Sequence, residues 1–541
     1  MKTKTKKTLK WIGIVLGSLI LIVVSLGIYV YSLIPKYKGE CPPLQTFLFT
    51  KPKTNLLMEG KYIYKPATEL ASMIRNHEAT SYDIVKEFIA NIKNNNYKYN
   101  AIVWLRENEA LEEAIKADEA VARGDSLPIL HGVPVTVKEM FWVKGLTNNL
   151  NAKMMGGFIA PEDGALVKQL KKSGAIILGT SNVPFMLGDF QTYGEIYPTC
   201  NNPYDTTKTP GGSSGGSAAA LAAGFTPLEL GSDLGGSISV PSAFCGVYGL
   251  KTTFGTLNMT QGTGPDTITK YSRFAMGVPG PMARTAEDIE LMWLALRETP
   301  IDQRFQQETK WQQSSDKELN QYRIGWTDDW QSAKVGNDVK EKLHLIITLL
   351  NEQGTYTEKN VPELNTDMQK SFFKSYALMF AENQPWIMRK LISMDFSKFD
   401  DGSTDMAAFY DAMNNPGEEN WKQWQQENAV LIEAWEKYFK KFNFVICPVT
   451  YGAAFNKCKL GTPIETTEGK IAYSFYSIPY SIVFAATGHP AVTIPVGFNK
   501  EGLPIGVQIV GSYYSEPELL HFTKLVEKLL LKFQKANNIL K

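Results

Sequence analysis

The chain has 541 residues, of which 44% are hydrophobic and 21% are charged, as is usual for soluble globular domains. Its five cysteines are scattered without a CxxC pair, which excludes a disulfide framework and the usual zinc-binding spacings. The net charge is +1, but residues 1–38 hold seven lysines and no acid, so residues 39–541 carry about −6. Because nucleic-acid binding needs a basic surface, we expect no nucleic-acid partner.

The N-terminal region predicts a membrane anchor. Residues 11–34 contain no charged side chain and would span roughly 36 Å as a helix, enough to cross a bilayer. Five lysines precede this stretch and only two follow it closely. This excess predicts a single-pass anchor with a cytoplasmic N-terminus and an extracytoplasmic body. A cleaved signal peptide is the alternative, but its apolar region is normally about 7–15 residues and ends in a small-x-small site.

Helix and strand signals alternate along the body, which favours an α/β fold. The predicted helices cover residues 69–77, 81–93, 108–123, 164–172, 217–223, 429–442 and 519–533. The predicted strands cover residues 132–137, 175–179, 227–230 and 444–447, and another buried apolar run covers 481–496. Glycine, proline and asparagine predict loops at 201–216 and 231–239.

The organisation predicted from these patterns is one large catalytic domain behind the anchor. Residues 365–441 are rich in Trp, Phe, Met and charge, and we expect them to form a helical cover over the core. The cover would line an acyl channel or simply pack on the core as surface helices. The expected units are a basic tail at 1–10, the anchor at 11–34, a connector at 35–66 and a single domain at 67–541.

Two serine-bearing glycine turns stand out, GGSSGG at residues 211–216 and DLGGS at residues 233–237. Glycine is needed where backbone N–H groups must converge on a small anion, and in acyl transfer that anion is the oxygen of the tetrahedral intermediate. Ser237 is the candidate nucleophile. The amides placed to form an oxyanion hole are those of Leu234, Gly235, Gly236 and Ser237. Two tight turns without chemistry are the alternative interpretation.

Three other serine or glycine patterns are poor matches. Gly-x-Ser-x-Gly at residues 211–215 would require a buried strand before it to form a nucleophile elbow, but residues 204–210 are polar and end in proline. Ser-x-x-Lys occurs at residues 314–317 and 371–374 without its SDN and KTG companions. A phosphate-binding loop would need a Gly-Lys-Ser/Thr ending, which GGSSGG lacks.

Lys138 is the best candidate for the base that activates Ser237. It follows an apolar predicted strand, and desolvation there lowers the pKa of a lysine. Action near pH 7 would require its pKa to fall by about three units from ~10.4. We regard the five histidines as weaker candidates for the base, and His489 lies in an apolar run where a packed histidine is expected. The alternative for Lys138 is a strand-end lysine in water.

Taken together, these motifs resemble the amidase signature family. Residues 208–256 are similar to its glycine- and serine-rich signature, and HGVPVTVKEMF at 131–141 is similar to its lysine strand. TGHPAVTIPVG at 487–497 and LPIGVQIVG at 503–511 resemble its C-terminal signatures. The resemblance extends from about residue 65 to the C-terminus, apart from a variable stretch at 300–440. It implies a large mixed twisted β-sheet covered by helices on both faces, and no cofactor or metal.

The resemblance implies a triad of Lys138, Ser213 and Ser237, with a cis peptide bond before Ser213. Neutral Lys138 would accept a proton from Ser213, which takes one from Ser237 as its oxygen attacks the amide carbonyl. The reverse relay would protonate the departing amine, leaving an acyl-enzyme that water hydrolyses. Ser214 and Asp233 would support this arrangement.

Within the family, the anchor and the Lys-Glu-x-Phe sequence at residues 138–141 resemble the membrane-bound fatty acid amide hydrolases. This implies an apolar or fatty acyl amide substrate, with Leu187 and Gly188 lining the acyl site. The alternatives are a glutamine-hydrolysing protein similar to the A subunit of a tRNA-dependent amidotransferase, and a catalytically silent membrane-tethered scaffold. The expected partners are the amide substrate and the membrane, and a homodimer is left open.

The sequence departs from the family at three positions near the second turn. Ser239 replaces the usual arginine of Gly-Gly-Ser-Ile-Arg, and Thr252 and Thr256 replace a proline and an arginine. None of these changes removes a triad residue. The loss of the first arginine puts in doubt any salt bridge behind the nucleophile.

Overall fold

The structure is a computed structural model that describes residues 43–53, 60–257, 262–263, 277–298, 311, 316–330, 333–362, 368–381, 385–396 and 404–530. The anchor predicted at residues 11–34 lies outside these residues. Within the described ranges, no helix is both long and apolar enough to cross a bilayer.

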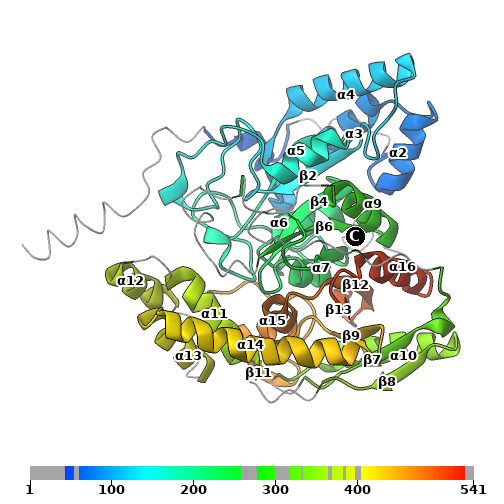
Figure 1. Cartoon of the computed structure of the whole chain (residues 1–541). Helices are drawn as coiled ribbons and strands as arrows, with labels where there is room; N and C mark the ends of the chain where they lie inside the picture. Colours follow the sequence, from blue (N-terminus) through cyan, green and yellow to red (C-terminus); the bar gives the residue numbers. More distant parts are fainter. Residues whose placement is uncertain are drawn as a thin grey trace, which may run out of the picture.

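A mixed sheet of eleven strands runs through the described part of the molecule (Figure 1). In chain order the strands are β1 (Ile102–Leu105), β2 (Pro134–Lys138), β3 (Ile176–Ser181), β4 (Leu228–Asp233), β5 (Tyr248–Lys251), β6 (Val278–Ala283), β7 (Arg323–Trp326), β8 (Tyr356–Lys359), β9 (Phe444–Pro448), β12 (Ala491–Phe498) and β13 (Pro504–Gly511). Their order in the sheet is β1-β3-β2-β4-β6-β5-β12-β13-β9-β7-β8. A separate hairpin joins β10 (Ile464–Thr466) and β11 (Gly469–Ile471). The expected large mixed sheet is therefore confirmed.

The directions of the strands place the predicted lysine strand in a parallel part of the sheet. β2 runs parallel to β3 on one side and to β4 on the other. All the residues of these three strands are buried, as expected for parallel strands covered on both faces. From β4 through β6, β5, β12 and β13 to β9 the neighbours are antiparallel.

Helices surround the sheet (Figure 1). They are α2 (Ala67–Arg75), α3 (Ser81–Tyr99), α4 (Glu107–Arg123), α5 (Ala165–Lys172), α6 (Gly215–Ala222), α7 (Ser239–Cys245), α9 (Ala286–Leu296), α10 (Asn337–Glu352), α11 (Met368–Ala381), α12 (Trp386–Phe396), α13 (Thr404–Asn414), α14 (Glu418–Phe439), α15 (Ile478–Thr487) and α16 (Glu516–Glu527). Short 3-10 turns are η1 (Thr46–Leu48), η2 (Lys153–Met155), η3 (Phe185–Leu187), η4 (Leu319–Gln321) and η6 (Ser474–Tyr476).

Local sequence signals explain several helix ends. The hydroxyl of Thr80 accepts a hydrogen bond from the Asp83 amide and caps the start of α3, a role that threonine favours. Gly124 ends α4 with a φ of 72°, a left-handed conformation that glycine adopts at little cost. Both ends lie where the sequence predicted helices.

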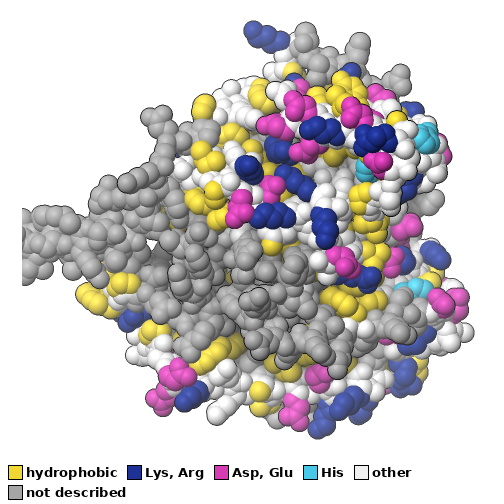
Figure 2. Space-filling view, turned by 45° about the horizontal axis from the view of Figure 1, so that its top comes forward, with side chains coloured by type: hydrophobic (Ala, Val, Ile, Leu, Met, Phe, Trp, Pro, Cys, Tyr) yellow, Lys and Arg dark blue, Asp and Glu magenta, His cyan; other side chains and the backbone are white. Residues whose placement is uncertain are grey.

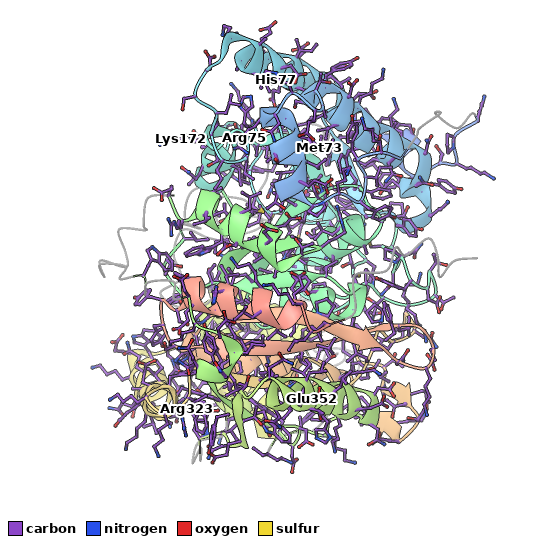
Figure 3. All side chains as sticks on the ribbon, turned by 90° about the vertical axis from the view of Figure 1, so that its right-hand side faces the viewer. Met73, Arg75, His77, Lys172, Arg323 and Glu352 are labelled. Atoms are coloured by element: carbon purple, nitrogen blue, oxygen red, sulfur yellow. The ribbon has the colours of Figure 1, made fainter. Side chains whose placement is uncertain are left out.

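Three groups of helices occupy different parts of the molecule. Helices α2, α3 and α4 lie together at one end, with Arg75 and His77 at the end of α2, whereas Arg323 of β7 and Glu352 of α10 lie at the opposite end (Figure 3). The tryptophan-rich segment contains α11, α12, α13 and α14, and α11 and α14 contact α15. Helices α6 and α7 lie beside the central strands (Figure 1) and contact each other.

Two predicted segments have different boundaries in the structure. The apolar run at 481–496 is not one element, because α15 ends at Thr487, Gly488 adopts a φ of 78°, and β12 begins at Ala491. The turn predicted at 231–239 is partly strand, because β4 continues to Asp233. In the first case near-uniform burial hides the boundary from a hydropathy pattern, and in the second the strand continues directly into the turn.

Candidate active site

Lys138 is the last residue of β2, and its side chain is 0% exposed. Its Nζ lies 2.7 Å from Ser213 Oγ and 2.9 Å from Ser232 Oγ. The carbonyl oxygen of Ser232 is 3.4 Å away. Hydroxyl and carbonyl oxygens thus surround the amine, and within the described residues it forms no salt bridge.

This environment favours the neutral form of Lys138. Burial lowers its pKa to about 7, while the negative charges of Asp233 and Glu229 oppose the shift. A lysine with such a pKa exchanges protons readily at neutral pH, as a general base requires. The strand-end lysine in water, the alternative from the sequence, is therefore wrong.

Ser213 is held in the buried turn between the two glycine pairs of GGSSGG. The peptide bond from Gly212 to Ser213 is cis, as the family resemblance implies. A Cβ placed on Gly212 would lie 2.4 Å from the carbonyl oxygen of Asp189. Only glycine therefore fits where the backbone of the Asp189 loop touches the turn.

Ser214 joins the first glycine turn to the second. Its amide donates to the carbonyl oxygen of Ser237 at 3.1 Å. Its hydroxyl donates to the carbonyl oxygen of Ser232 at 3.2 Å. Ser214 thus fixes the position of one turn relative to the other.

The carboxylate of Asp233 organises the turn that carries Ser237. One oxygen accepts from the amide of Gly236 at 2.7 Å, and the other accepts from the amides of Ile238 at 2.8 Å and Ser239 at 3.1 Å. The turn wraps around this buried side chain. Ser237 itself is half-buried, and its hydroxyl forms no hydrogen bond with another described residue, so it is free to meet a substrate.

The amides expected to form an oxyanion hole differ in whether they already have an acceptor. The Gly236 amide donates a hydrogen bond to Asp233. Its N–H is therefore not available to an oxyanion in this structure, and the prediction that Gly236 contributes to the oxyanion hole is wrong. The amides of Leu234, Gly235 and Ser237 have no acceptor among the described residues. The sequence could not reveal this difference, because it depends on the direction of the Asp233 side chain.

Ser239, which stands where the family usually has an arginine, contacts Asp233. Its hydroxyl donates to Asp233 at 3.1 Å, to the same oxygen that its amide contacts. Asp233 forms no salt bridge in the described part of the chain. A hydrogen bond from a hydroxyl to a carboxylate therefore occupies this position.

The loop predicted to contact the substrate lies against the first glycine turn. Leu187 ends η3 with a φ of 62° and is half-buried, and Gly188 is exposed. The next residue, Asp189, packs on Gly212 and accepts a hydrogen bond from the hydroxyl of Tyr473. Burial raises the pKa of Asp189 to about 6. Substrate contact by Leu187 and Gly188 stays a prediction.

Sequence reasoning missed Ser232 and Glu229. Both belong to β4, which runs beside the lysine strand, and Glu229 pairs with Thr136. Burial raises the pKa of Glu229 to about 7. The available signal was that both precede the Asp233 turn, but their proximity to Lys138 follows only from the pairing of the strands.

The histidines remain apart from this arrangement. His489 is buried, and its ring nitrogens lie 3.1 Å from Glu436 of α14 and 2.9 Å from the Thr487 hydroxyl. Burial lowers its pKa. The carboxylate of Glu436 lies beside His489 although the two residues are distant in the sequence. In the described structure, no contact joins His489 to Lys138, Ser213 or Ser237. It packs in the core as predicted.

Charged side chains of both signs lie on the face of the molecule shown in Figure 2. In that view, lysine and arginine side chains are interspersed with aspartate and glutamate over the described surface. The expectation of no nucleic-acid partner, made from the net charge of the sequence, stays a prediction.

The site combines a buried amine, a bridging hydroxyl, a half-exposed hydroxyl and free backbone amides. The first two can transfer a proton, the third can attack a carbonyl carbon, and the amides can bind the resulting oxyanion. This combination suits acyl transfer.

Comparisons with known proteins agree with this chemistry. The family described as Amidase matches residues 83–520. The A subunit of a glutamyl-tRNA(Gln) amidotransferase from Alkaliphilus metalliredigens is 29% identical over 467 residues, covering 82% of this chain and 91% of that protein.

Solved structures share the fold. An inhibitor-bound structure from a vestigial protein complex, connected with the evolutionary origins of an s-triazine catabolic enzyme, has a TM-score of 0.72 and 27% identity, covering 87% of this chain and 100% of that one. A fatty acid amide hydrolase has a TM-score of 0.73 and 19% identity, covering 93% of each chain. The latter likeness concerns the fold alone.

Proposed function

The chain belongs to the amidase family and is an amidase, and from that premise we propose that it cleaves a carboxamide through an acyl-enzyme on Ser237. The single observation that carries this proposal is the 2.7 Å contact between buried Lys138 and Ser213. Ser214 ties this pair to the turn of Ser237. These contacts support the assignment of a base, a relay and a nucleophile to neighbouring positions in the fold.

The proposed reaction begins with proton transfer among these residues. Neutral Lys138 accepts the proton of Ser213, and Ser213 takes the proton of Ser237 while the Ser237 oxygen bonds to the amide carbon. The amides of Leu234, Gly235 and Ser237 stabilise the oxyanion, and losing one such donor typically costs about 2.7–4 kcal/mol. Reversal of the relay protonates the nitrogen, and the C–N bond breaks.

Deacylation uses the same groups. After ammonia or an amine leaves, water attacks the ester on Ser237, and the relay takes the proton from that water. The tetrahedral intermediate then releases the carboxylic acid and returns the proton to Ser237. No redox partner is required.

For the substrate, the comparisons support the glutamine alternative better than the fatty acyl amide expected from the sequence. Several curated relatives are amidotransferase A subunits, at 26–29% identity. The fatty acid amide hydrolase likeness, at 19% identity, supports only the fold. We therefore propose a primary carboxamide of the glutamine class as the first substrate to test. The retained anchor at residues 11–34, with an extracytoplasmic body, remains a proposal that C-terminal reporter fusions would test.

A fluorophosphonate probe tests the nucleophile independently of the substrate. We expect covalent labelling of the wild type and none of Ser237→Ala, with Ser72→Ala as a control because Ser72 is exposed on α2, far along the chain from both turns. Equal labelling of wild type and Ser237→Ala, or no labelling of either folded protein, would contradict the proposal. Loss of the signal in Ser72→Ala would show that labelling does not report on the site.

The substrate is tested by measuring ammonia release from glutamine, a short aliphatic amide and oleamide at equal concentrations. We expect the largest kcat/KM for glutamine. A preference for oleamide would restore the fatty amide hypothesis, while the proposed chemistry on Ser237 would remain.

A further inference from the structure

Hydroxyl groups and a carboxyl group meet directly over the lysine strand. Because β3 and β4 flank β2, side chains from these two strands can contact each other only by crossing the face of β2. Ser181 of β3 does so, and its hydroxyl donates to the carboxylate of Glu229. Ser181 pairs in register with Lys138, and Glu229 pairs with Thr136. The contact therefore lies on the face of β2 between these two positions.

Glu229 shares this face with Lys138. Residues two apart on a strand point to the same side, so Thr136 and Lys138 share a face of the sheet. Glu229 is the partner of Thr136 on the neighbouring strand. Helix α6 covers the same face, because the hydroxyl of its Ser217 lies 2.9 Å from Ser181 Oγ. Helix α6 begins two residues after Ser213, so this cluster connects the lysine strand to the relay serine.

The carboxylate is buried and only partly satisfied. Glu229 is 0% exposed, and its second oxygen has no hydrogen-bond partner among the described residues. No salt bridge neutralises it there. A buried carboxylate in such a position acts on nearby charges through a medium of low dielectric constant.

We propose that Glu229 is a positioning residue for the amidase reaction, which sets the basicity of Lys138 from the neighbouring strand. The charged groups that act on the Lys138 amine are Asp233 and Glu229, both of β4. Without Glu229, desolvation would reduce the basicity of the amine further. The cluster of Ser181, Ser217 and Glu229 thus keeps Lys138 basic enough to take a proton at neutral pH.

Glu139 offers a matched control. It is also 0% exposed and immediately follows Lys138 in the chain. Its carboxylate accepts from the amide of Asn149 at 2.7 Å and from the hydroxyl of Tyr197 at 3.4 Å. Burial raises the pKa of Glu139 to about 8, so it carries little charge at neutral pH. Two buried glutamates near one lysine therefore differ in their expected effect.

The test is the rate of fluorophosphonate labelling of Ser237 as a function of pH, so it rests on the proposed function. The pKa of Glu229 is itself about 7, so near the midpoint its carboxylate carries a partial negative charge that favours the protonated amine. For Glu229→Gln, which removes this charge, we expect the midpoint of the acid limb to move to lower pH by roughly half a unit. Glu139→Gln should leave the midpoint in place. Thermal unfolding of each variant confirms folding.

Ser181→Ala keeps the test decisive if Glu229→Gln does not fold. Loss of the donor to Glu229 disfavours its charged form, so the midpoint should move in the same direction by a smaller amount. An unchanged midpoint, a shift to higher pH, or an equal shift in Glu139→Gln would overturn the role of Glu229. Failure of the wild type to label at Ser237 would instead overturn the proposed function.

Discussion

The two halves of the site are built in opposite ways. The floor, defined as Lys138, Ser213, Ser232 and Glu229, is buried and held by contacts between side chains. The nucleophile turn, residues 233–239, is held by backbone amides that converge on one carboxylate, and it leaves Ser237 half-buried. The difference follows from the chemistry, because a lysine must be sealed from water to lose its charge, whereas a nucleophile must be reached by the substrate.

Among the substitutions that test this difference, replacement of Lys138 should reduce activity most. In Lys138→Met the relay has no base, so we expect kcat/KM to fall by roughly 10⁴-fold or more. The folded state should tolerate the change, since methionine fills a similar buried volume without an ionisable group. Steady-state kinetics and thermal unfolding would check this. Activity within tenfold of the wild type would mean that Lys138 is not the base.

Removal of the carboxylate that holds the nucleophile turn should have an intermediate effect. Asp233→Ala leaves three amides and one hydroxyl without their acceptor. We expect kcat to fall by about 10²-fold and the free energy of unfolding to fall by about 2–4 kcal/mol. Denaturant unfolding and kinetics on the same samples would check both values. A variant with normal kcat would show that the turn keeps its shape without Asp233.

Ser239→Ala should have the smallest effect. It removes a single hydroxyl donor to Asp233, while the amide of residue 239 still donates. The expected loss is about 0.5–1.5 kcal/mol in the free energy of unfolding and less than fivefold in kcat/KM. If the loss instead equalled that of Asp233→Ala, the hydroxyl and not the amides would hold the turn.

These two halves also differ in how far the sequence could predict them. The glycine turns, Ser237 and the alternation of helices and strands are visible as local patterns, and strand β2 lies within one or two residues of its predicted bounds. Apolar neighbours on the same strand favoured a buried Lys138 but left open a strand-end lysine in water, and its assignment to a triad followed from the family resemblance. The turns and the alternating elements were visible because they depend on adjacent residues.

The remaining features depend on contacts between distant segments. Glu229 lies beside Lys138 only because β4 pairs with β2. The occupied amide of Gly236 depends on the rotamer of Asp233. Likewise, His489 meets Glu436 through the packing of α14, 53 residues away in the chain. A single sequence carries no local pattern that specifies these contacts.

The most direct test of the central claim is the pH dependence of Ser237 labelling in the wild type. Because the pKa of Lys138 is about 7, the amine is mostly charged below that pH and mostly neutral above it. We therefore predict that the labelling rate rises with pH through a midpoint near 7 and then becomes constant. A midpoint near 10, the value of a solvated lysine, or a rate that does not change between about pH 5 and pH 9 would contradict the account.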